Sequence, residues 1–291
     1  MTDDQQVQQQ LAEAFAQAGV SAGLHAVDLA DGREIAHQAD QRQVLASVFK
    51  VPVLVALLRS DLDLTEQVTV PVEGRTAGPT GLSKMTDPVT LSLRDLARLM
   101  IVVSDNAATD VVMERLGLPA VKQALLDLGL HGTDVGYDVA GVFQTFLDDA
   151  GVATLDEFVK DPTTELLDGM RALQRDHVNV GTARDLTRLL ALLWNDEAAS
   201  PERCALGRDI LLQQVWPHRL ASGFPEDGIT TGGKTGTLPR VRNEVGVVTY
   251  PDGGRYAVAV FTTAASLAQK NPAADAVIGR AARLAVDALR R

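Results

Sequence analysis

The order of apolar and polar positions divides the chain into three parts, and the first part begins with a helix. Residues 4–18 carry apolar side chains at helical spacing among glutamines and alanines, and Gly19 ends the pattern. Two short alternating runs, GLHAVDLA and REIAHQAD, then flank Asp31-Gly32. Alternation on both sides of an Asp-Gly pair is typical of a β-hairpin. The chain therefore begins helix, strand, strand.

The second part is mostly helical and opens with the unbroken apolar run VPVLVALL at residues 51–58. Its length suits a buried helix, although its valines would also suit a strand. We favour a helix because Ser47 is a good N-cap residue and Pro52 is tolerated only near a first turn. Helical patterns then continue over residues 92–103, 106–116, 118–128, 163–173, 182–194 and 203–214.

The third part returns to strands from Thr230 onward, and a final amphipathic helix covers roughly residues 270–290. The strand-like runs are ITTGGKTGT, NEVGVVTY and RYAVAVFTTA, the last two separated by an Asp-Gly-Gly turn. Strands at both ends with helices between them predict an α/β (α+β) fold. We expect one antiparallel sheet of five strands, flanked by the terminal helices, with an all-helical domain inserted between its strands.

This order also predicts how the chain divides into domains. Residues 1–42 and 215–291 should form a discontinuous sheet domain, and residues 43–214 should form the helical domain. The two ends of the chain would then lie close together. Binding sites occur preferentially at domain junctions, so we expect the functional site between these two parts.

Composition and charge limit the possible partners. With 46% hydrophobic and 22% charged residues, the 291-residue chain is typical of a soluble, globular protein. A net charge of −11 argues against nucleic acid or an anionic membrane as a partner. No run of about 18 apolar residues occurs, so no membrane span is expected. Cys204 is the only cysteine, and the five histidines show no ligand-like spacing, so we expect neither a disulfide nor a metal site.

The N-terminus, MTDDQQVQQQ, is acidic and has no apolar segment of the kind a signal peptide needs. If Met1 is the native start, the protein stays in the cytoplasm; if a signal peptide has been removed, it is exported. We expect a monomer that needs no cofactor and acts on a small molecule.

Candidate chemistry begins with Ser47 and Lys50. At three residues apart on a helix, the two side chains share one face. A desolvated lysine loses its proton more readily and can activate a neighbouring hydroxyl as a nucleophile. The free N–H groups at a helix N-terminus would favour negative charge on the attacked group. Alone, Ser-x-x-Lys is a weak signal, because a capping serine and a solvated lysine give the same pattern.

A second motif, Ser104-Asp105-Asn106, directly follows the predicted helix that ends at residue 103. Ser104 offers a hydroxyl for proton relay, and Asn106 can donate a hydrogen bond to an amide oxygen. By itself the tripeptide is also a common helix cap or turn.

A third motif, Lys234-Thr235-Gly236-Thr237, lies on the first strand of the C-terminal group. Lys234 supplies a cation for proton relay and is a candidate catalytic residue. Gly236 has no side chain to keep a substrate from lying against the strand. The backbone N–H of Thr237, together with that of Ser47, could form an oxyanion hole. Lys-Thr-Gly alone is also a common strand end.

In this order and with these gaps, the three motifs are those of the penicillin-recognising serine enzymes. From Ser47 to about Thr263 the sequence resembles the class A β-lactamases and their serine-hydrolase relatives. The resemblance implies a β-lactamase/transpeptidase-like fold and acyl transfer through Ser47, with Lys50 as its base partner. It also implies that Ser104 passes a proton to the leaving nitrogen.

The same resemblance implies how a substrate with an acyl carbonyl and a carboxylate is held. Asn106 would position the acyl amide, and the Lys-Thr-Gly-Thr strand would bind the carboxylate and the oxyanion. A second cation would come from one of two arginines, both of which could equally be surface charges. The implied substrate-binding residues are Asn106, Lys234, Thr235, Gly236, Thr237 and either Arg219 or Arg242.

One departure from the family pattern concerns deacylation. Class A enzymes carry Glu-x-x-Leu-Asn downstream of the second motif, and that glutamate activates the deacylating water. The corresponding region here, VGYDVAGVF, contains no glutamate. Glu165 lies 69 residues before Lys234, near the family's spacing on that side, and is a weak catalytic candidate. A glutamate on a helix surface is the competing interpretation. We expect acylation to be kept and β-lactam turnover to be slow.

Other functions remain as alternatives. Within the same fold, the protein could be an esterase or amidase, or a D-alanyl peptidase. In other classes, it could be a binding protein without catalysis, or a nucleotide-binding protein, because residues 228–235 match the P-loop pattern. A P-loop needs a strand before it and a helix after it, and neither is predicted. Residues 19–23 match the nucleophile elbow of α/β-hydrolases, but Ser21 follows a helix and precedes a strand.

Overall fold

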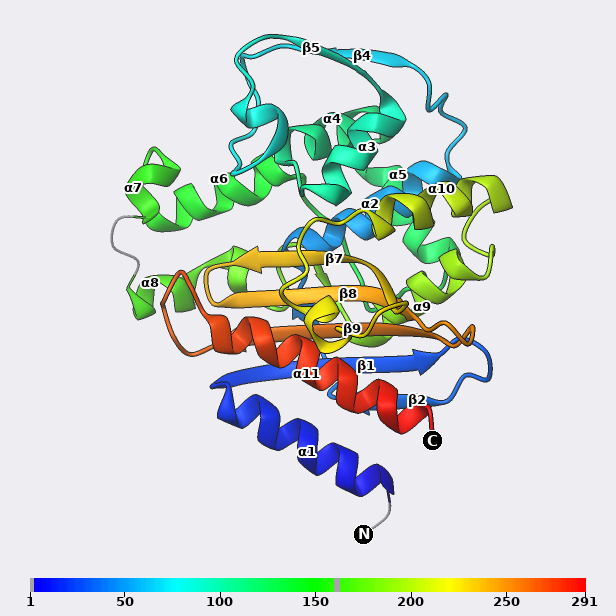
Figure 1. Cartoon of the computed structure of the whole chain (residues 1–291). Coiled ribbons are helices and arrows are strands. Elements are labelled where there is room, and N and C mark those ends of the chain that lie inside the picture. The colour runs from blue at the N-terminus through cyan, green and yellow to red at the C-terminus, as the bar shows by residue number, and fades with distance from the viewer. Residues whose placement is uncertain (1–2, 160–162) are drawn as a thin grey trace.

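The computed structural model describes residues 3–159 and 163–291, and its centre is one antiparallel sheet of five strands (Figure 1). The strand order is β2-β1-β9-β8-β7, so strands from both ends of the chain pair side by side. The predicted sheet is therefore confirmed. Its strands are β1 (Val20–Asp28), β2 (Glu34–His37), β7 (Thr230–Leu238), β8 (Val241–Thr249) and β9 (Arg255–Ala264).

The first and last helices, α1 (Asp3–Gln17) and α11 (Pro272–Leu289), pack together on one face of this sheet. Leu11 of α1 and Ile278 of α11 share an apolar cluster with Val258 of β9, and all three are fully buried. Burying such side chains stabilises the layer by about 1.5–3 kcal/mol each. The terminal helices thus flank the sheet as predicted.

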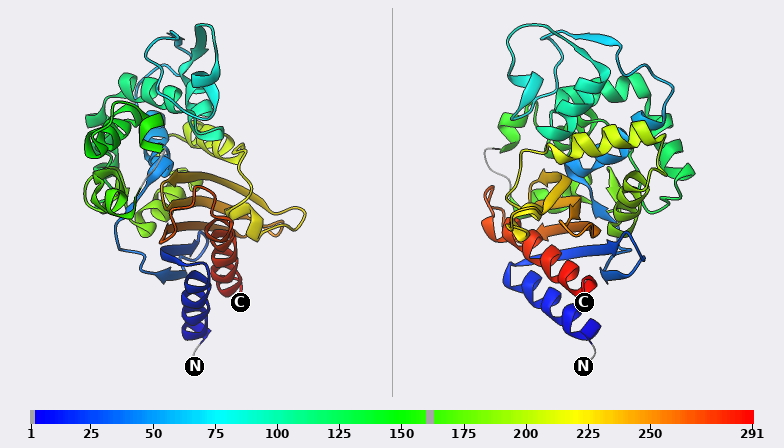
Figure 2. Two further views of the ribbon diagram at one scale, coloured as in Figure 1. Left: turned by 90° about the vertical axis from the view of Figure 1, so that its left-hand side faces the viewer. Right: turned by 45° about the vertical axis from the view of Figure 1, so that its right-hand side comes forward.

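The opposite face of the sheet is covered by the helical part of the chain, so the sheet lies between α11 and that part (Figure 2, left). Helices α9 (Ala183–Trp194) and α10 (Pro201–Leu212) pack on the sheet there, and α2 (Lys50–Arg59) packs against α10. Their apolar side chains form a single cluster with those of β8 and β9. The core therefore runs across the predicted boundary between residues 43–214 and the rest, and the division into two domains stays a prediction.

The remaining elements belong to the helical part, except η4, which packs against α11. Two short antiparallel ladders join β3 to β6 and β4 to β5. The elements are β3 (Gln43–Val44), β4 (Gln67–Val70), β5 (Val89–Ser92), β6 (Val180–Gly181), α3 (Leu93–Val102), α4 (Asn106–Leu116), α5 (Leu118–Asp127), α6 (Val139–Ala150), α7 (Leu155–Val159), α8 (Thr164–Gly169), and the 3-10 turns η1 (Ala46–Phe49), η2 (Gly81–Lys84), η3 (Arg171–Leu173) and η4 (Leu220–Gly223).

Some local predictions were wrong. Ser47 is not the N-cap of an α-helix, because it lies inside η1 and α2 begins only at Lys50. The helix predicted over residues 163–173 is divided into α8 and η3, since Met170 has extended backbone angles. Helix α6 was not predicted; it begins inside VGYDVAGVF, where the Asp138 side chain caps the N–H of Gly141.

No helix in residues 3–159 and 163–291 is long and apolar enough to span a membrane. In the same ranges, no group of three or more histidine, cysteine, aspartate or glutamate side chains is arranged to hold a metal ion. The expected monomeric state and the absence of a nucleic-acid partner stay predictions.

Candidate active site

Ser47 lies on η1, which links β3 to α2 and packs directly against the edge strand β7. Gly236 of β7 makes this approach possible. A Cβ atom at that position would lie 2.6 Å from the carbonyl oxygen of Leu45 and 3.2 Å from the backbone nitrogen of Val48. The missing side chain therefore leaves room for η1. Ala46, the residue before Ser47, has a positive φ of 47°, a strained conformation of the kind that clusters at functional sites.

Lys50 is fully buried at the first turn of α2 and reaches the second motif. Its Nζ donates hydrogen bonds to the backbone oxygen of Ser104 at 2.8 Å and to Oδ1 of Asn106 at 3.0 Å, and lies 3.3 Å from Ser104 Oγ. Burial lowers the pKa of Lys50 to about 7, although the charges of Asp105 and Asp110 act in the opposite direction. Much of this amine is therefore neutral near neutral pH and able to accept a proton.

The second motif is held in place by Asp105, which is itself fully buried. Its carboxylate caps the N-terminus of α4 and accepts the N–H of Leu82 at 2.7 Å. Ser104 has a positive φ of 62°, and Asn106 donates its Nδ2 to the carbonyl oxygen of Ala77 at 2.9 Å. That contact turns Oδ1 of Asn106 toward Lys50. Lys50 of the first motif is therefore in direct contact with the second motif.

Lys234 is fully buried on β7 and donates to the backbone oxygen of Thr235 at 2.8 Å. Burial lowers the pKa of Lys234 well below its ordinary value, and the charge of Lys50 lowers it further, while Glu244 acts in the opposite direction. A substrate carboxylate would supply the negative charge that this amine lacks and would restore its charged form. The electrostatics thus favour an anionic group beside β7.

Of the two candidate arginines, Arg219 is directed at the site. It is buried, donates Nη2 to Thr237 Oγ1 at 2.9 Å, and is held by Asp275 at 2.7 Å from its Nε. Arg242 instead donates to the backbone oxygens of Leu238, Val241 and Gln269. The geometry favours Arg219 as the second cation and gives Arg242 a role in holding the β7–β8 turn.

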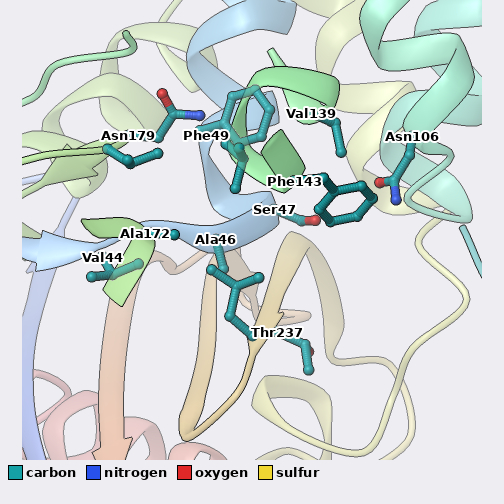
Figure 3. A pocket seen from close by; sticks show the side chains of 13 residues that line it. Val44, Ala46, Ser47, Phe49, Asn106, Val139, Phe143, Ala172, Asn179 and Thr237 are labelled. Carbon is teal, nitrogen blue, oxygen red and sulfur yellow. The ribbon is translucent and has the colours of Figure 1, made fainter. Parts of the chain in front are cut away.

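Two cavities open on Ser47, and Phe143 of α6 lines both of them. Figure 3 shows the Phe143 ring directed toward Ser47 and Asn106. The smaller cavity, about 80 Å³, is mostly apolar and is lined by Val44, Ala46, Ser47, Phe49, Asn106, Val139, Val142, Phe143, Ala172, Val178, Asn179, Thr237 and Leu238. The larger one, about 360 Å³, is lined by Ser47, Pro79, Val103, Ser104, Asn106, Phe143, Trp216, His218, Arg219, Thr235 and Thr237.

Neither of these two cavities has a carboxylate among its described lining residues. Glu165, the weak candidate, is exposed on α8 and does not line either one. The competing interpretation, a glutamate on a helix surface, fits this position, and we propose no catalytic role for Glu165. Sequence reasoning missed Phe143, because α6 was not predicted. It also missed Asn179, whose side chain holds the loop before α6 through the N–H groups of Gly136 and Tyr137.

Two other motif matches lack the structure that their functions need. Residues 228–235 lead into and along β7, which continues as a strand to Leu238, so no helix N-terminus follows to bind phosphate. Ser21 lies inside β1 and not at a strand-to-helix turn. Both matches were expected to be accidental, and the fold agrees.

Comparison with known proteins matches this architecture to one family. The model of the β-lactamase enzyme family matches residues 6–289, which is nearly the whole chain. The chain belongs to the β-lactamase enzyme family. The predicted resemblance is thereby confirmed, and the protein is a serine hydrolase of the β-lactamase-like type.

Relatives of the chain include both a regulatory protein and β-lactamases. The chain is 31% identical over 310 residues to the β-lactamase regulatory protein BlaB of Streptomyces cacaoi, covering all of this chain and 99% of that protein. It is 26% identical to the carbapenem-hydrolyzing β-lactamase KPC of Klebsiella oxytoca, covering 93% of this chain and 85% of that enzyme.

Solved structures of the family share the fold. The β-lactamase of Sphaerobacter thermophilus superimposes with a TM-score of 0.75 at 28% identity, covering 94% of this chain and 95% of that one. A variant of the reconstructed ancestral class A β-lactamase of Gram-negative bacteria gives 0.80 at 25% identity, covering 98% and 99%. The structure of PBP-A gives 0.78 at 24% identity, which is a likeness of fold alone. The β-lactamase/transpeptidase-like fold is therefore confirmed.

Proposed function

We propose that this protein is acylated on Ser47 by carboxylate-bearing β-lactams and releases the acyl group slowly. The observation that carries the proposal is the set of residues that line the two cavities at Ser47. Their described lining residues include hydroxyls, amides and a cation, which acylation and recognition need, but no carboxylate. The family membership makes β-lactams fitting substrates.

Acylation would use residues of all three motifs. The Oγ of Ser47 attacks the β-lactam carbonyl carbon, and Lys50, with its pKa near 7, takes the hydroxyl proton directly or through a water. The N–H groups of Ser47 and Thr237 would stabilise the oxyanion. When the C–N bond breaks, Ser104, which lies 3.3 Å from the amine of Lys50, passes a proton to the leaving nitrogen.

Recognition would place the substrate carboxylate in the larger cavity. Thr235 and Thr237 line this cavity with Arg219, and the buried amine of Lys234 lies on the same strand. Charge-assisted hydrogen bonds to a carboxylate are roughly twice as strong as neutral ones. The carboxylate would therefore set the orientation of the substrate in the cavity. Asn106 would contact the acyl amide from the other side.

Deacylation is the step that lacks a dedicated base. A positioned general base typically contributes about 10²–10⁴-fold to such a step. The smaller cavity is lined by Val139, Val142 and Phe143 together with the amides of Asn106 and Asn179, and none of these side chains can take a proton from a water. The acyl-enzyme should therefore accumulate.

A time course with a chromogenic cephalosporin tests this proposal. We expect one equivalent of product in a fast first phase, a steady rate lower by about 10²-fold or more, and an adduct on Ser47 by intact mass. Glu165→Gln serves as a control and should behave like the wild type. Rapid steady hydrolysis without an adduct would contradict the proposal, and its loss in Glu165→Gln would identify Glu165 as the base.

Hydrolysis of small neutral esters is a second candidate activity. The smaller cavity is apolar and, at about 80 Å³, holds only a short acyl group. A small acyl group leaves room for water beside Ser47, and the partly neutral Lys50 could then serve as the base of both steps. The same protein should turn over an activated acetate ester steadily while it keeps a penicilloyl group on Ser47 for a long time. That result would support the esterase activity.

The role of Lys234 predicts a difference between two substrate types. Lys234→Ala should slow acylation by a penicillin about tenfold or more, because the carboxylate loses a charged partner, and should affect a neutral activated ester much less. Acylation rates with both substrates measure this. Lys84→Ala, which removes an exposed lysine and leaves the site intact, is the control for net charge. Equal losses on both substrates would show that Lys234 acts in the chemistry.

A further inference from the structure

A buried carboxylate, Glu244 of β8, lies directly behind the strand that carries the third motif. It is 2% exposed and stands opposite Thr235 in the β7–β8 register. Its Oε1 accepts a hydrogen bond from Nε2 of Gln214 at 2.6 Å, and its Oε2 accepts the backbone N–H of Leu220 at 2.7 Å. Both oxygens are therefore engaged, and each partner comes from the segment that connects α10 to β7.

Gln214 connects Glu244 to the third motif. Its Oε1 accepts the backbone N–H of Thr235 at 2.6 Å. Because β7 is an edge strand, the outward N–H groups of its residues have no neighbouring strand to pair with. The carboxamide of Gln214 thus substitutes for a strand partner at the centre of the Lys-Thr-Gly-Thr motif.

The second oxygen of Glu244 acts on the other wall of the cavity. Leu220, whose N–H it accepts, directly follows Arg219 in the chain. Arg219 in turn donates to Thr237 Oγ1 at 2.9 Å and to the carbonyl oxygen of Gly236 at 3.0 Å. One carboxylate therefore fixes both the strand that presents Thr235 and the segment that presents Arg219.

The surrounding charges suit this arrangement. Burial raises the pKa of Glu244 to about 7, while the hydrogen bonds from Leu220 and Gln214, and then the cations Arg219 and Lys234, act in the opposite direction. In its ionised form a carboxylate only accepts hydrogen bonds, which is what the two donors that face Glu244 require. A neutral amide in the same place could accept only through its single oxygen.

We propose that Glu244 is a positioning residue for carboxylate recognition, acting through Gln214 on Thr235 and through Leu220 on Arg219. This inference rests on the proposed function, in which Thr235, Thr237 and Arg219 receive the substrate carboxylate. Glu244 touches no reacting atom. It sets the separation and orientation of the two walls between which that carboxylate binds.

The direction of each hydrogen bond provides a sharp test. In Glu244→Gln, the new amide group must face either the Nε2 of Gln214 or the N–H of Leu220, so two donors oppose each other. Adding Gln214→Glu reverses the order of the pair. Glutamate at position 214 then accepts from Thr235 and from the new glutamine, whose oxygen accepts from Leu220. The double variant therefore satisfies every contact that the single variant breaks.

The experiment measures acylation rate constants for a fluorescent penicillin and for a neutral activated ester, together with melting temperatures. Loss of one buried, charge-assisted contact in Glu244→Gln should slow penicillin acylation about tenfold and ester acylation by less than about threefold. The double variant should recover to within about threefold of the wild type. If Glu244→Gln does not fold, Gln214→Leu removes both contacts of the Gln214 carboxamide, to Thr235 and to Glu244, while Glu244 keeps its contact with Leu220. This variant should show the same selective loss.

The possible failures are distinguishable. A wild-type protein that penicillin does not acylate would overturn the proposed function, and this inference with it. A wild type that is acylated, with Glu244→Gln or Gln214→Leu equally slowed on both substrates, would show that Glu244 only stabilises the fold. Full activity in the single variants, or no recovery in the folded double variant, would likewise overturn the positioning role.

Discussion

Replacing Ser47 by alanine is expected to abolish covalent labelling by penicillins. In the described part of the chain, Ser47 lines both cavities that would receive the substrate, and the only other hydroxyl-bearing residues that line them are Ser104, Thr235 and Thr237. Loss of the nucleophile from a serine hydrolase costs about 10⁶-fold in rate. Intact mass after incubation with a fluorescent penicillin measures the effect, and the adduct should be absent at all times.

Ser21→Ala is the matched control, because it removes an exposed hydroxyl from the accidental nucleophile-elbow match on β1 and should leave labelling unchanged. Ser104→Ala should still be labelled, although more slowly, since it loses only the proton relay. An adduct of the same stoichiometry on Ser47→Ala would mean that another side chain is the nucleophile.

Lys50→Met is expected to lower the acylation rate by about 10²–10⁴-fold, the usual contribution of a positioned general base. Methionine fills much of the same buried volume, so the variant removes the amine with little change in packing. The fold should persist, because the eight residues that follow Lys50 on α2 are all buried. Lys122→Met, on an exposed lysine that pairs with Asp134 at 3.2 Å, should acylate like the wild type.

The same amine predicts a pH dependence. Because burial lowers the pKa of Lys50 to about 7, its neutral, proton-accepting form increases as the pH rises through 7. The wild-type acylation rate should therefore rise from about pH 5.5 to 8 with its midpoint near 7, and Lys50→Met should lose this rise. A pH-independent wild type, or the same rise in Lys50→Met, would assign the titration to another group.

The sequence by itself determined the elements whose signals are local. Alternating runs predicted the strands that became β1, β2, β8 and β9, and helical spacing predicted α1 and α11 on the sheet. These patterns are readable because one face of each element must be apolar to be buried. The motifs around Ser47, Ser104 and Lys234 also identified the family, because their order and spacing can be read directly from the sequence.

Tertiary structure alone decided how those groups behave. The lowered pKa of Lys50 comes from burial by segments distant in sequence, and the choice between Arg219 and Arg242 depends on which guanidinium reaches Thr237. Gly236 leaves room for η1, an approach that no local pattern of β7 records. The contact of Glu244 with Gln214 joins residues 30 positions apart. Desolvation and hydrogen bonds between distant parts of the chain depend on which residues become neighbours in three dimensions. The sequence alone does not show those neighbours.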